Sequence, residues 1–419
     1  MKTRYQISTI NASPFGGLFI ISELLHRMKF EALFQEVFGD IRKVRKTSPV
    51  NNISLLIATI LSGGERLYDV ERLAEDPVLP ELFGNGYVPQ YTSIRDDLQK
   101  IGAMDEARQE FLFRLNEKLF RHLQLESITI DIDGSAISVD GYQENAEKGY
   151  CPEDPGSRCF QSLSAICLET ETPLMEQTRS GDTHCACNII EFVRTLLDRF
   201  SPQMAKIWVR LDAGFYSAKL VKLLESYPKV IYEIGVPQKG YLKRKVRSLE
   251  YQHYHGSQRE YGYFGNLKRR YYCERSIRPV NSQLNLLEDD RHNYRVVISN
   301  DWNRQPHTLF EHYNKRGVVE KDFAELKNEY ALGKMVSGDF QVTKALFWVN
   351  YLAFAIIGFF RKVALRWEYA HYRLRRLRFY LFSTIAYFVL HARKRILNLA
   401  QPQMGEMRFK FILQRTWSF

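Results

Sequence analysis

The chain has 419 residues, of which 45% are hydrophobic and 13% aromatic, enough to bury the cores of two or three domains. It shows no internal repeat and no low-complexity tract, and this excludes solenoid and intrinsically disordered proteins. The formal net charge of +11 indicates an acidic partner, which could be a nucleic acid, an acidic protein or a membrane surface.

Two segments bear on the cellular compartment. The N-terminal stretch MKTRYQISTINASP lacks the apolar centre of a signal peptide, so we expect a cytoplasmic protein. The longest apolar run, Ala345 to Phe360, is 16 residues long and contains Asn350. Because a membrane-spanning helix needs about 20 apolar residues, this run predicts a buried core helix and no membrane contact.

Residues 1–123 are predicted to be helical. Apolar residues recur at helical spacing in segments 16–39, 50–61 and 105–123. Such a small helical bundle could serve for structural packing or as a DNA-binding head, and the sequence leaves both open.

The pattern changes to period two after residue 123. In SITIDIDGS, isoleucines face one side of a predicted strand, while Thr129, Asp131 and Asp133 face the other. Two strands follow around a turn at 170–172, and then a helix, a strand ending at Asp212, a second helix and a further strand at 229–237. The alternation predicts an α/β unit.

Residues 239–295 break this rhythm and are interpreted as an insertion. Between Tyr241 and Arg270 there are eight Lys or Arg residues against two Glu, interleaved with six aromatics. Aromatics among cations favour a nucleic acid as the partner, because bases stack while phosphates pair with cations. The candidate DNA contacts in this segment are Lys243, Arg244, Lys268, Arg269 and Arg270.

The C-terminal segment carries the charge excess. From Arg361 to Phe419 there are 13 Lys or Arg residues against two Glu, a net of +11, which equals the excess of the whole chain. The densest stretches are RLRRLRFY (373–380) and HARKR (391–395). We expect basic helices here, with a solvated helical face as the alternative to a DNA contact. The candidate DNA contacts are Arg373, Arg375, Arg376 and Arg378.

The six cysteines form no CxxC pair, and HCAC at 184–187 is their tightest cluster. A structural zinc site would need a second pair of ligands at a suitable spacing. We therefore expect reduced thiols without a metal.

One predicted helix, 313–330, carries an ordered polar line. Tyr313, Arg316, Glu320 and Lys327 stand at offsets of 0, 3, 7 and 14 residues. At about 100° per residue, they fall within roughly 60° of arc. Surface ion pairs between successive turns are the alternative explanation of this line.

Three acids stand at positions that suit a divalent metal. Asp133 and Asp212 close two predicted strands, and Glu320 lies on the helix. Either aspartate alone would be an ordinary turn residue, but strand ends of one sheet converge, and a helix across them can add a third carboxylate. Such oxygen ligands suit Mg²⁺, and two ions would clamp both oxygens of a phosphoryl displacement. Asp131, on the same face as Asp133, is the fallback ligand.

These segments carry a family resemblance. The spacing Tyr313-x2-Arg316-x3-Glu320-x6-Lys327 is similar to the Y-R-E-K motif of bacterial insertion-sequence DDE transposases. DIDGS and VRLDAGFYS resemble the segments around their two catalytic aspartates. GYQENAEKGYCP and ERLAEDPVL resemble insertion sequence family 1380 in particular. The resemblance covers most of the chain and is weakest in the last 50 residues or so.

The resemblance implies an α/β fold with a ribonuclease H-like catalytic core at 124–238 plus 296–365. A β-rich basic insertion at 239–295 would interrupt this core. A helical N-terminal DNA-binding domain at 1–123 would precede it, and a basic helical region at 366–419 would follow.

The resemblance also implies the roles of the site residues. Asp133, Asp212 and Glu320 would hold two Mg²⁺ ions, for which Mn²⁺ would substitute. Tyr313, Arg316 and Lys327 would bind DNA phosphates near the scissile bond, since Arg suits bidentate contact and Lys acts as a point charge.

The implied activity is cut-and-paste DNA transposition by strand cleavage and strand transfer, with hairpin ends as one route. The partners would be double-stranded DNA (terminal inverted repeats and target DNA) and a second copy of the chain, in a cytoplasmic, nucleoid-associated complex. Two alternatives remain: a non-transposing nuclease of the same fold, and a retired transposase that only binds DNA.

Overall fold

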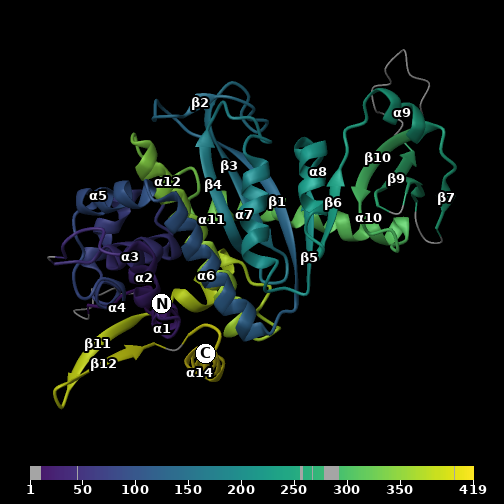
Figure 1. Cartoon of the computed structure of the whole chain (residues 1–419). Helices are drawn as coiled ribbons and strands as arrows, with labels where there is room; N and C mark the ends of the chain where they lie inside the picture. Colours follow the sequence, from purple (N-terminus) through teal and green to yellow (C-terminus); the bar gives the residue numbers. More distant parts are fainter. Residues whose placement is uncertain (1–10, 45, 255–257, 267, 278–291, 401) are drawn as a thin grey trace, which may run out of the picture.

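The computed structural model describes residues 11–44, 46–254, 258–266, 268–277, 292–400 and 402–419 (Figure 1). It is a mixed α/β structure in which one large mixed sheet runs from a helical bundle at one end to a β-rich insertion at the other.

The described part of residues 1–123 is helical, as predicted. It contains η1 (Gly16–Leu18), α1 (Phe19–Arg27), α2 (Phe30–Phe38), α3 (Pro49–Ser62), η2 (Leu67–Glu75), α4 (Leu79–Phe83), α5 (Tyr91–Gly102) and α6 (Asp105–Leu123). Local sequence sets the ends of α3: the Ser48 hydroxyl accepts a 3.3 Å hydrogen bond from the Asn51 amide, Pro49 follows, and Gly63 closes the helix at φ 106°.

The apolar run of the C-terminal half forms α12 (Phe340–Val363), around which the N-terminal helices pack. This helix is long and apolar enough to cross a membrane, but its most apolar stretch is completely buried inside the fold. The structure thus agrees with the predicted core helix. Because α12 shares one hydrophobic cluster with α1, α2, α3, α5 and α6, the N-terminal bundle has no core of its own.

The central segment forms the larger part of the sheet. It contains β1 (Ser127–Ser138), β2 (Glu147–Lys148), β3 (Arg158–Cys167), β4 (Thr172–Ser180), α7 (Ile189–Phe200), β5 (Lys206–Leu211), η3 (Ala213–Phe215), α8 (Ala218–Glu225) and β6 (Val230–Gly235). β3 pairs antiparallel with both β4 and β1, and β1 is followed across the sheet by the parallel strands β5 and β6. Helices α7 and α8 cover the apolar face of β1, β5 and β6, which leaves the polar face for the other side.

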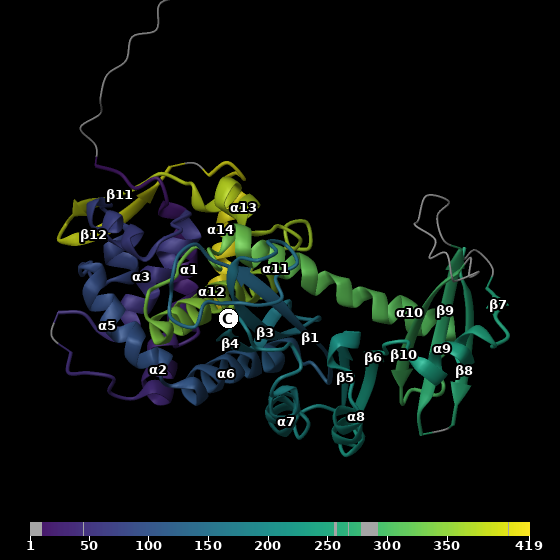
Figure 2. The same ribbon diagram turned by 90° about the horizontal axis from the view of Figure 1, so that it is seen from above.

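The predicted β-rich insertion extends this sheet instead of forming a separate one. It contains α9 (Gly240–Arg247), β7 (Gln252–His253), β8 (Glu260–Gly265), β9 (Arg270–Ile277) and β10 (His292–Ser299). β10 pairs antiparallel with β6, so the order continues β6-β10-β9-β8-β7 (Figures 1 and 2). The predicted boundary at 295/296 therefore falls inside a strand, because β10 belongs to both parts.

The helix with the polar line starts earlier than predicted and is interrupted. Helix α10 (Pro306–Asn314) passes into the 3-10 turn η4 (Lys315–Gly317) and then into α11 (Val318–Glu329). Figure 2 shows them as one long rod from the insertion towards the bundle. Tyr313 thus lies in the last turn of α10, and the 3-10 turn shifts the angular spacing between it and Glu320 from that of a regular helix.

The prediction of basic helices for the C-terminal region is wrong in part. The region contains α13 (Leu374–Leu377), the π-helical turn η5 (Arg378–Phe382), β11 (Ala386–His391), β12 (Lys394–Leu399) and α14 (Glu406–Ser418). β11 and β12 form an antiparallel hairpin. The aromatic and β-branched residues of these two segments favour strands, and this preference outweighs the helical expectation drawn from their charge.

Candidate active site

Parallel pairing of β1 and β5 brings Asp133 and Asp212 together. Ile132 is paired with Leu211 across the two strands. Asp133 directly follows Ile132 in the sequence, and Asp212 directly follows Leu211. Since neighbouring strands lie about 4.8 Å apart, the two aspartates lie side by side. Asp212 ends its strand as predicted, but the prediction for Asp133 is wrong, because pairing with β3 extends β1 to Ser138. The Asp212 carboxylate accepts a 2.6 Å hydrogen bond from the Ala213 amide and is exposed.

Arg316 links Asp133 to Glu320. Its Nη1 lies 2.9 Å from Oδ2 of Asp133, and its Nη2 lies 3.7 Å from Oε1 of Glu320. The Glu320 side chain is 70% exposed, whereas Asp133 and Arg316 are mostly covered. The spacing of four residues between Arg316 and Glu320 survives the 3-10 turn, so Glu320 lies beside the guanidinium that binds Asp133.

The charges of the site shift one another's pKa. Burial raises the pKa of Asp133, Arg316 opposes this shift, and the negative charge of Asp212 adds to it. Burial alone would lower the pKa of Arg316, but Asp133, Tyr313 and Asp212 together raise it above its ordinary value. The site therefore holds a fixed cation among three acids.

The carboxylates of Asp133, Asp212 and Glu320 are the donors that a metal ion in this site would use. Three carboxylates are the hard oxygen ligands that Mg²⁺ prefers, and their chemistry fits such an ion. Within the described ranges, however, no group of three His, Cys, Asp or Glu side chains is arranged to hold a metal, and Arg316 lies between Asp133 and Glu320. Binding would require this guanidinium to move. The described residues of HCAC form no such group either.

Tyr313 occupies a different place from the one predicted for a phosphate contact. Its side chain is buried, and its hydroxyl donates a 3.0 Å hydrogen bond to the carbonyl of Leu211, which precedes Asp212. Gly235 leaves room for this phenol, since a Cβ there would lie 2.8 Å from the hydroxyl oxygen. The geometry thus gives Tyr313 a role in placing the end of β5, and its hydroxyl could reach a phosphate only by leaving Leu211.

Lys327 lies along the same helix but faces a loop. Its Nζ is 2.7 Å from Oε2 of Glu153, a side chain that is 70% exposed. The lysine lines a pocket with residues of that loop and of the end of β1. An exposed carboxylate that holds a lysine in this way can be replaced by a phosphate at little cost.

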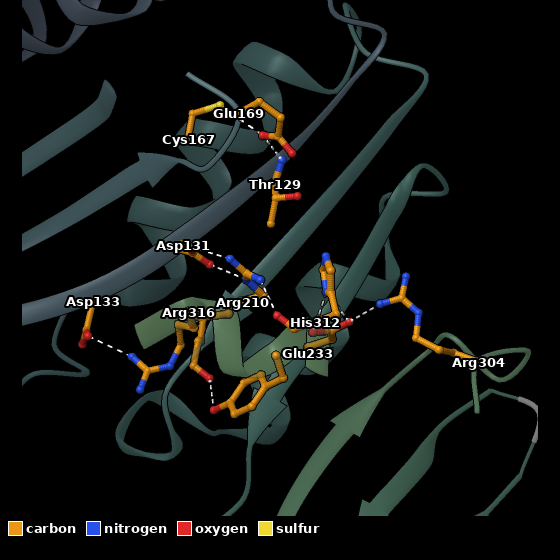
Figure 3. A network of polar contacts seen from close by, with 12 residues as sticks. Thr129, Asp131, Asp133, Cys167, Glu169, Arg210, Glu233, Arg304, His312 and Arg316 are labelled. Atoms are coloured by element: carbon orange, nitrogen blue, oxygen red, sulfur yellow. Dashed lines mark hydrogen bonds and ion pairs between the residues drawn. The ribbon is translucent and has the colours of Figure 1, made fainter. Parts of the chain in front are cut away.

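Asp131, the fallback ligand, is bound by Arg210, a residue to which the sequence pattern gave no role. Arg210 donates to both of its carboxylate oxygens, at 2.5 and 2.6 Å, and both side chains are buried (Figure 3). The structure therefore assigns Asp131 to a buried ion pair. A metal would have to displace a bidentate arginine to reach it.

The pair belongs to a row of charges that runs straight across three strands. Asp131 is in register with Arg210, and Arg210 with Glu233 of β6. The fully buried Glu233 contacts Nδ1 of His312 (2.9 Å) and the Arg304 guanidinium (3.0 Å), as Figure 3 shows. A single charge inside each of two apolar strands, VRL and YEI, was the sequence signal for this network.

The predicted DNA-contacting cations of the insertion are partly engaged within the chain. Arg269 donates two hydrogen bonds to Glu225 (2.5 and 2.8 Å), and Lys268 lies 3.8 Å from the same carboxylate. Arg270 donates to the Trp302 carbonyl and stacks over the exposed Tyr263 ring at 4.5 Å. The remaining two predicted cations, both on α9, are Lys243 and Arg244.

The arginine-rich stretch near α13 contains two arginines that bind other parts of the chain and two that are exposed. Arg373 pairs with the buried Glu325 at 3.0 Å, and Arg378 donates to the carbonyls of Leu61 and Ile60, so both hold the fold together. The side chains of Arg375 and Arg376 are exposed. They line a cavity of about 1060 Å³ beside α11.

Comparison with known proteins identifies the family of the chain. Residues 6–416 match the family model described as transposase DDE domain group 1. No match is found among curated proteins. Among solved structures, the chain is similar to one described as the piggyBac transposase synaptic complex with hairpin DNA, at 12% identity and a TM-score of 0.43, over 90% of this chain and 83% of that one. Because the family model spans nearly the whole chain, this protein belongs to the DDE transposase family.

Proposed function

We propose that the chain is a DNA transposase that binds the ends of its own element and catalyses metal-dependent strand cleavage and strand transfer. The observation that carries the proposal is the side-by-side position of Asp133 and Asp212 directly after the last pair of the β1/β5 ladder, with Glu320 linked to Asp133 through Arg316. Membership of the DDE transposase family supports it.

Asp133, Asp212 and Glu320 are proposed as the ligands of two Mg²⁺ ions, with Mn²⁺ as a substitute. When bound, such ions supply Lewis-acid activation of the attacking and leaving oxygens of an in-line phosphoryl displacement. The chain's own part is to hold three carboxylates at one place despite their mutual repulsion. Arg316 balances that repulsion until cations do so.

Arg316 and Lys327 are proposed to bind the DNA backbone on either side of the scissile phosphate. Arg316 would have to leave Asp133 and Glu320 to bind a phosphate, and its planar guanidinium suits such a contact. Lys327 would exchange the exposed Glu153 for a phosphate. Tyr313 would act as a positioning residue, because its hydroxyl fixes the carbonyl that precedes Asp212.

Finer features of the proposal extend from the same site. The strand order β4-β3-β1-β5-β6, in which the last three strands are parallel to one another, supports a ribonuclease H-like core. Assignment to insertion sequence family 1380, the Y-R-E-K motif, a hairpin intermediate, a homodimer on paired ends and a nucleoid location are proposed on the sequence resemblance. The described insertion and the exposed Arg375 and Arg376 would give the DNA further cationic contacts.

The test is a cleavage assay with Mg²⁺ on DNA that carries the repeats flanking the coding sequence. The wild-type chain and Glu320→Gln are compared, with Glu311→Gln on α10 as a control that removes an exposed carboxylate of the same rod. Cutting at the repeat tips that is lost only in Glu320→Gln, followed by joining of the 3′ end to target DNA, is the expected result.

Other outcomes would point to the two alternatives. Cutting without joining would indicate a nuclease of the same fold. Tight and specific binding without cutting would indicate a retired transposase that binds DNA. Equal cutting by Glu320→Gln and the wild-type chain would show that Glu320 is not a ligand.

A further inference from the structure

The C-terminal hairpin, β11 and β12 with their turn, has no part in the site described above. It projects from the helical bundle in both views (Figures 1 and 2). Its base is fixed by two backbone hydrogen bonds between Ala386 and Ser13, of 2.8 and 2.9 Å. Every residue from Val389 to Ile396 is exposed. A two-stranded ribbon that is exposed over its outer half buries little to stabilise itself, so its exposure suggests that something else covers it.

The register defines which face of the hairpin is free. Leu390 is opposite Arg395, and cross-strand partners share a face. At Arg395 this face is turned towards the body, because the guanidinium lies 3.9 Å from the Phe388 ring centroid and 2.9 Å from Glu81 of α4, whereas Leu390 nearer the tip is 81% exposed. The opposite face is the outer one. It carries Tyr387, Val389, His391, Lys394, Ile396 and Asn398.

The turn at the tip is built in an unfavourable way. Ala392 and Arg393 have φ values of 49° and 62° between the paired residues His391 and Lys394. This is a two-residue turn with both central residues in the left-handed region, where Gly and Asn are preferred. Strained residues of this kind gather at functional sites. Here the strain places the side chain of Arg393 at the apex.

The tip is strongly cationic. No Asp or Glu occurs between Glu368 and Glu406. Arg393 and Lys394 are exposed, and among the residues that the structure describes neither has an ion-pair partner. Two identical tips would repel one another, which disfavours a second copy of the chain as the occupant despite the apolar Val389 and Ile396. A polyanion suits this charge.

We propose that the C-terminal hairpin is an arm that enters the major groove of duplex DNA. The major groove admits a two-stranded β-ribbon. In this arrangement Arg393 and Lys394 contact phosphates, while Asn398 and His391 of the outer face are directed at base edges. The proposal rests on the proposed function only for the identity of the DNA, the element ends, and not for the binding itself.

The test is the salt dependence of DNA binding by the full chain, measured by fluorescence anisotropy on a duplex of the flanking repeat and on a scrambled duplex of equal length. The variant is Arg393→Gln with Lys394→Gln. The control, Lys219→Gln with Lys222→Gln, removes two exposed lysines from α8 on the far side of the sheet. Because each phosphate contact contributes about 0.9 to the slope of log K against log salt, the tip variant should lower the slope by about 1.8. The control should keep the wild-type slope.

A second variant separates base reading from charge. Asn398→Ala should reduce the preference for the flanking repeat over the scrambled duplex about tenfold, with an unchanged salt slope. An unchanged slope in the tip variant would overturn the proposal, and so would a tip variant that changes the sedimentation of the DNA-free chain, which would make the hairpin a contact between copies. Cleavage by the wild-type chain is scored separately: binding through the tip without any cutting would contradict the proposed function and leave the arm in place.

Discussion

Asp133 and Asp212 stand next to each other because the pair that precedes them, Ile132 and Leu211, is the last one in the parallel ladder between β1 and β5. Neither aspartate can leave this position without a shift in strand register, and a shift of one residue would turn every side chain of the strand to the other face. The register thus fixes the spacing of the two acids before any ligand arrives.

Two like charges held in this way predict opposite effects of one substitution. Asp212→Asn should lower the rate of metal-dependent DNA cleavage by more than about a hundredfold, as expected when a metal site is damaged. It should also raise the free energy of unfolding slightly without metal, because the repulsion with Asp133 is relieved. Single-turnover cleavage and urea denaturation with a chelator measure the two effects. A variant that is less stable and equally active would contradict the site.

The buried pair of Asp131 and Arg210 predicts a large loss of stability when it is broken. Arg210→Met should lower the free energy of unfolding by about 3–5 kcal/mol, because it leaves the Asp131 carboxylate buried without a partner. The double variant Arg210→Met with Asp131→Leu should recover most of this loss. Arg194→Met removes an arginine that is 48% exposed on α7 and should change the value by less than about 0.5 kcal/mol. A small effect of Arg210→Met in denaturant melts would show that the carboxylate has another partner.

Gly235 predicts an indirect route to the active site. A Cβ at this position would lie 2.8 Å from the Tyr313 hydroxyl and 2.9 Å from the Ala213 amide nitrogen. Gly235→Ala should therefore displace the end of β5 and reduce cleavage about tenfold or more, with little change in DNA affinity. Tyr313→Phe alone should cost about 1 kcal/mol of stability by loss of one hydrogen bond. The double variant Gly235→Ala with Tyr313→Phe should cleave DNA faster than Gly235→Ala alone, since Tyr313→Phe removes one of the two atoms that the new Cβ would clash with. Equal cleavage rates would show that the clash with Tyr313 does not cause the loss of activity.

The contact between Glu225 and Arg269 predicts a dependence of stability on pH. Hydrogen bonds from Arg269, which outweigh burial, lower the pKa of Glu225 below its ordinary value of 4.5. A carboxyl whose pKa is lower in the folded state contributes stability above pH 4.5, and this contribution is lost as the pH falls through the lowered value. Glu225→Gln should thus reduce stability by about 1 kcal/mol at pH 7 and by progressively less below pH 4.5. Thermal melts of the wild-type chain and of Glu225→Gln, at pH 7 and at a pH below 4.5, measure this difference in stability. Glu191→Gln, which breaks an exposed pair with Arg194 on α7, should show no such trend.

Much of the fold could be predicted from the sequence because its signals are local. The alternation around Asp133 and Asp212 predicted two strands. The contact of Arg316 with Glu320 is an ion pair between successive turns, which was the alternative explanation of the polar line. Both follow from the periodicity of the backbone, which depends on a few neighbouring residues. The order of strands and helices from residue 127 to 235 could be predicted for the same reason.

Only the tertiary structure decided which of several residues with similar local patterns lies in the active site and which stabilises the fold. Asp131 and Asp133 have the same local pattern, yet Arg210 from the neighbouring strand takes one of them and leaves the other for the site. Tyr313 is buried because Gly235, 78 positions before it in the sequence, leaves a space for its hydroxyl. The hairpin of β11 and β12 was not predicted, because the charge of the segment indicated a helix. Whether the segment forms a strand depends on the residues that pair with it from the opposite strand. Such partners come from distant segments, and a sequence pattern within one element holds no information about them.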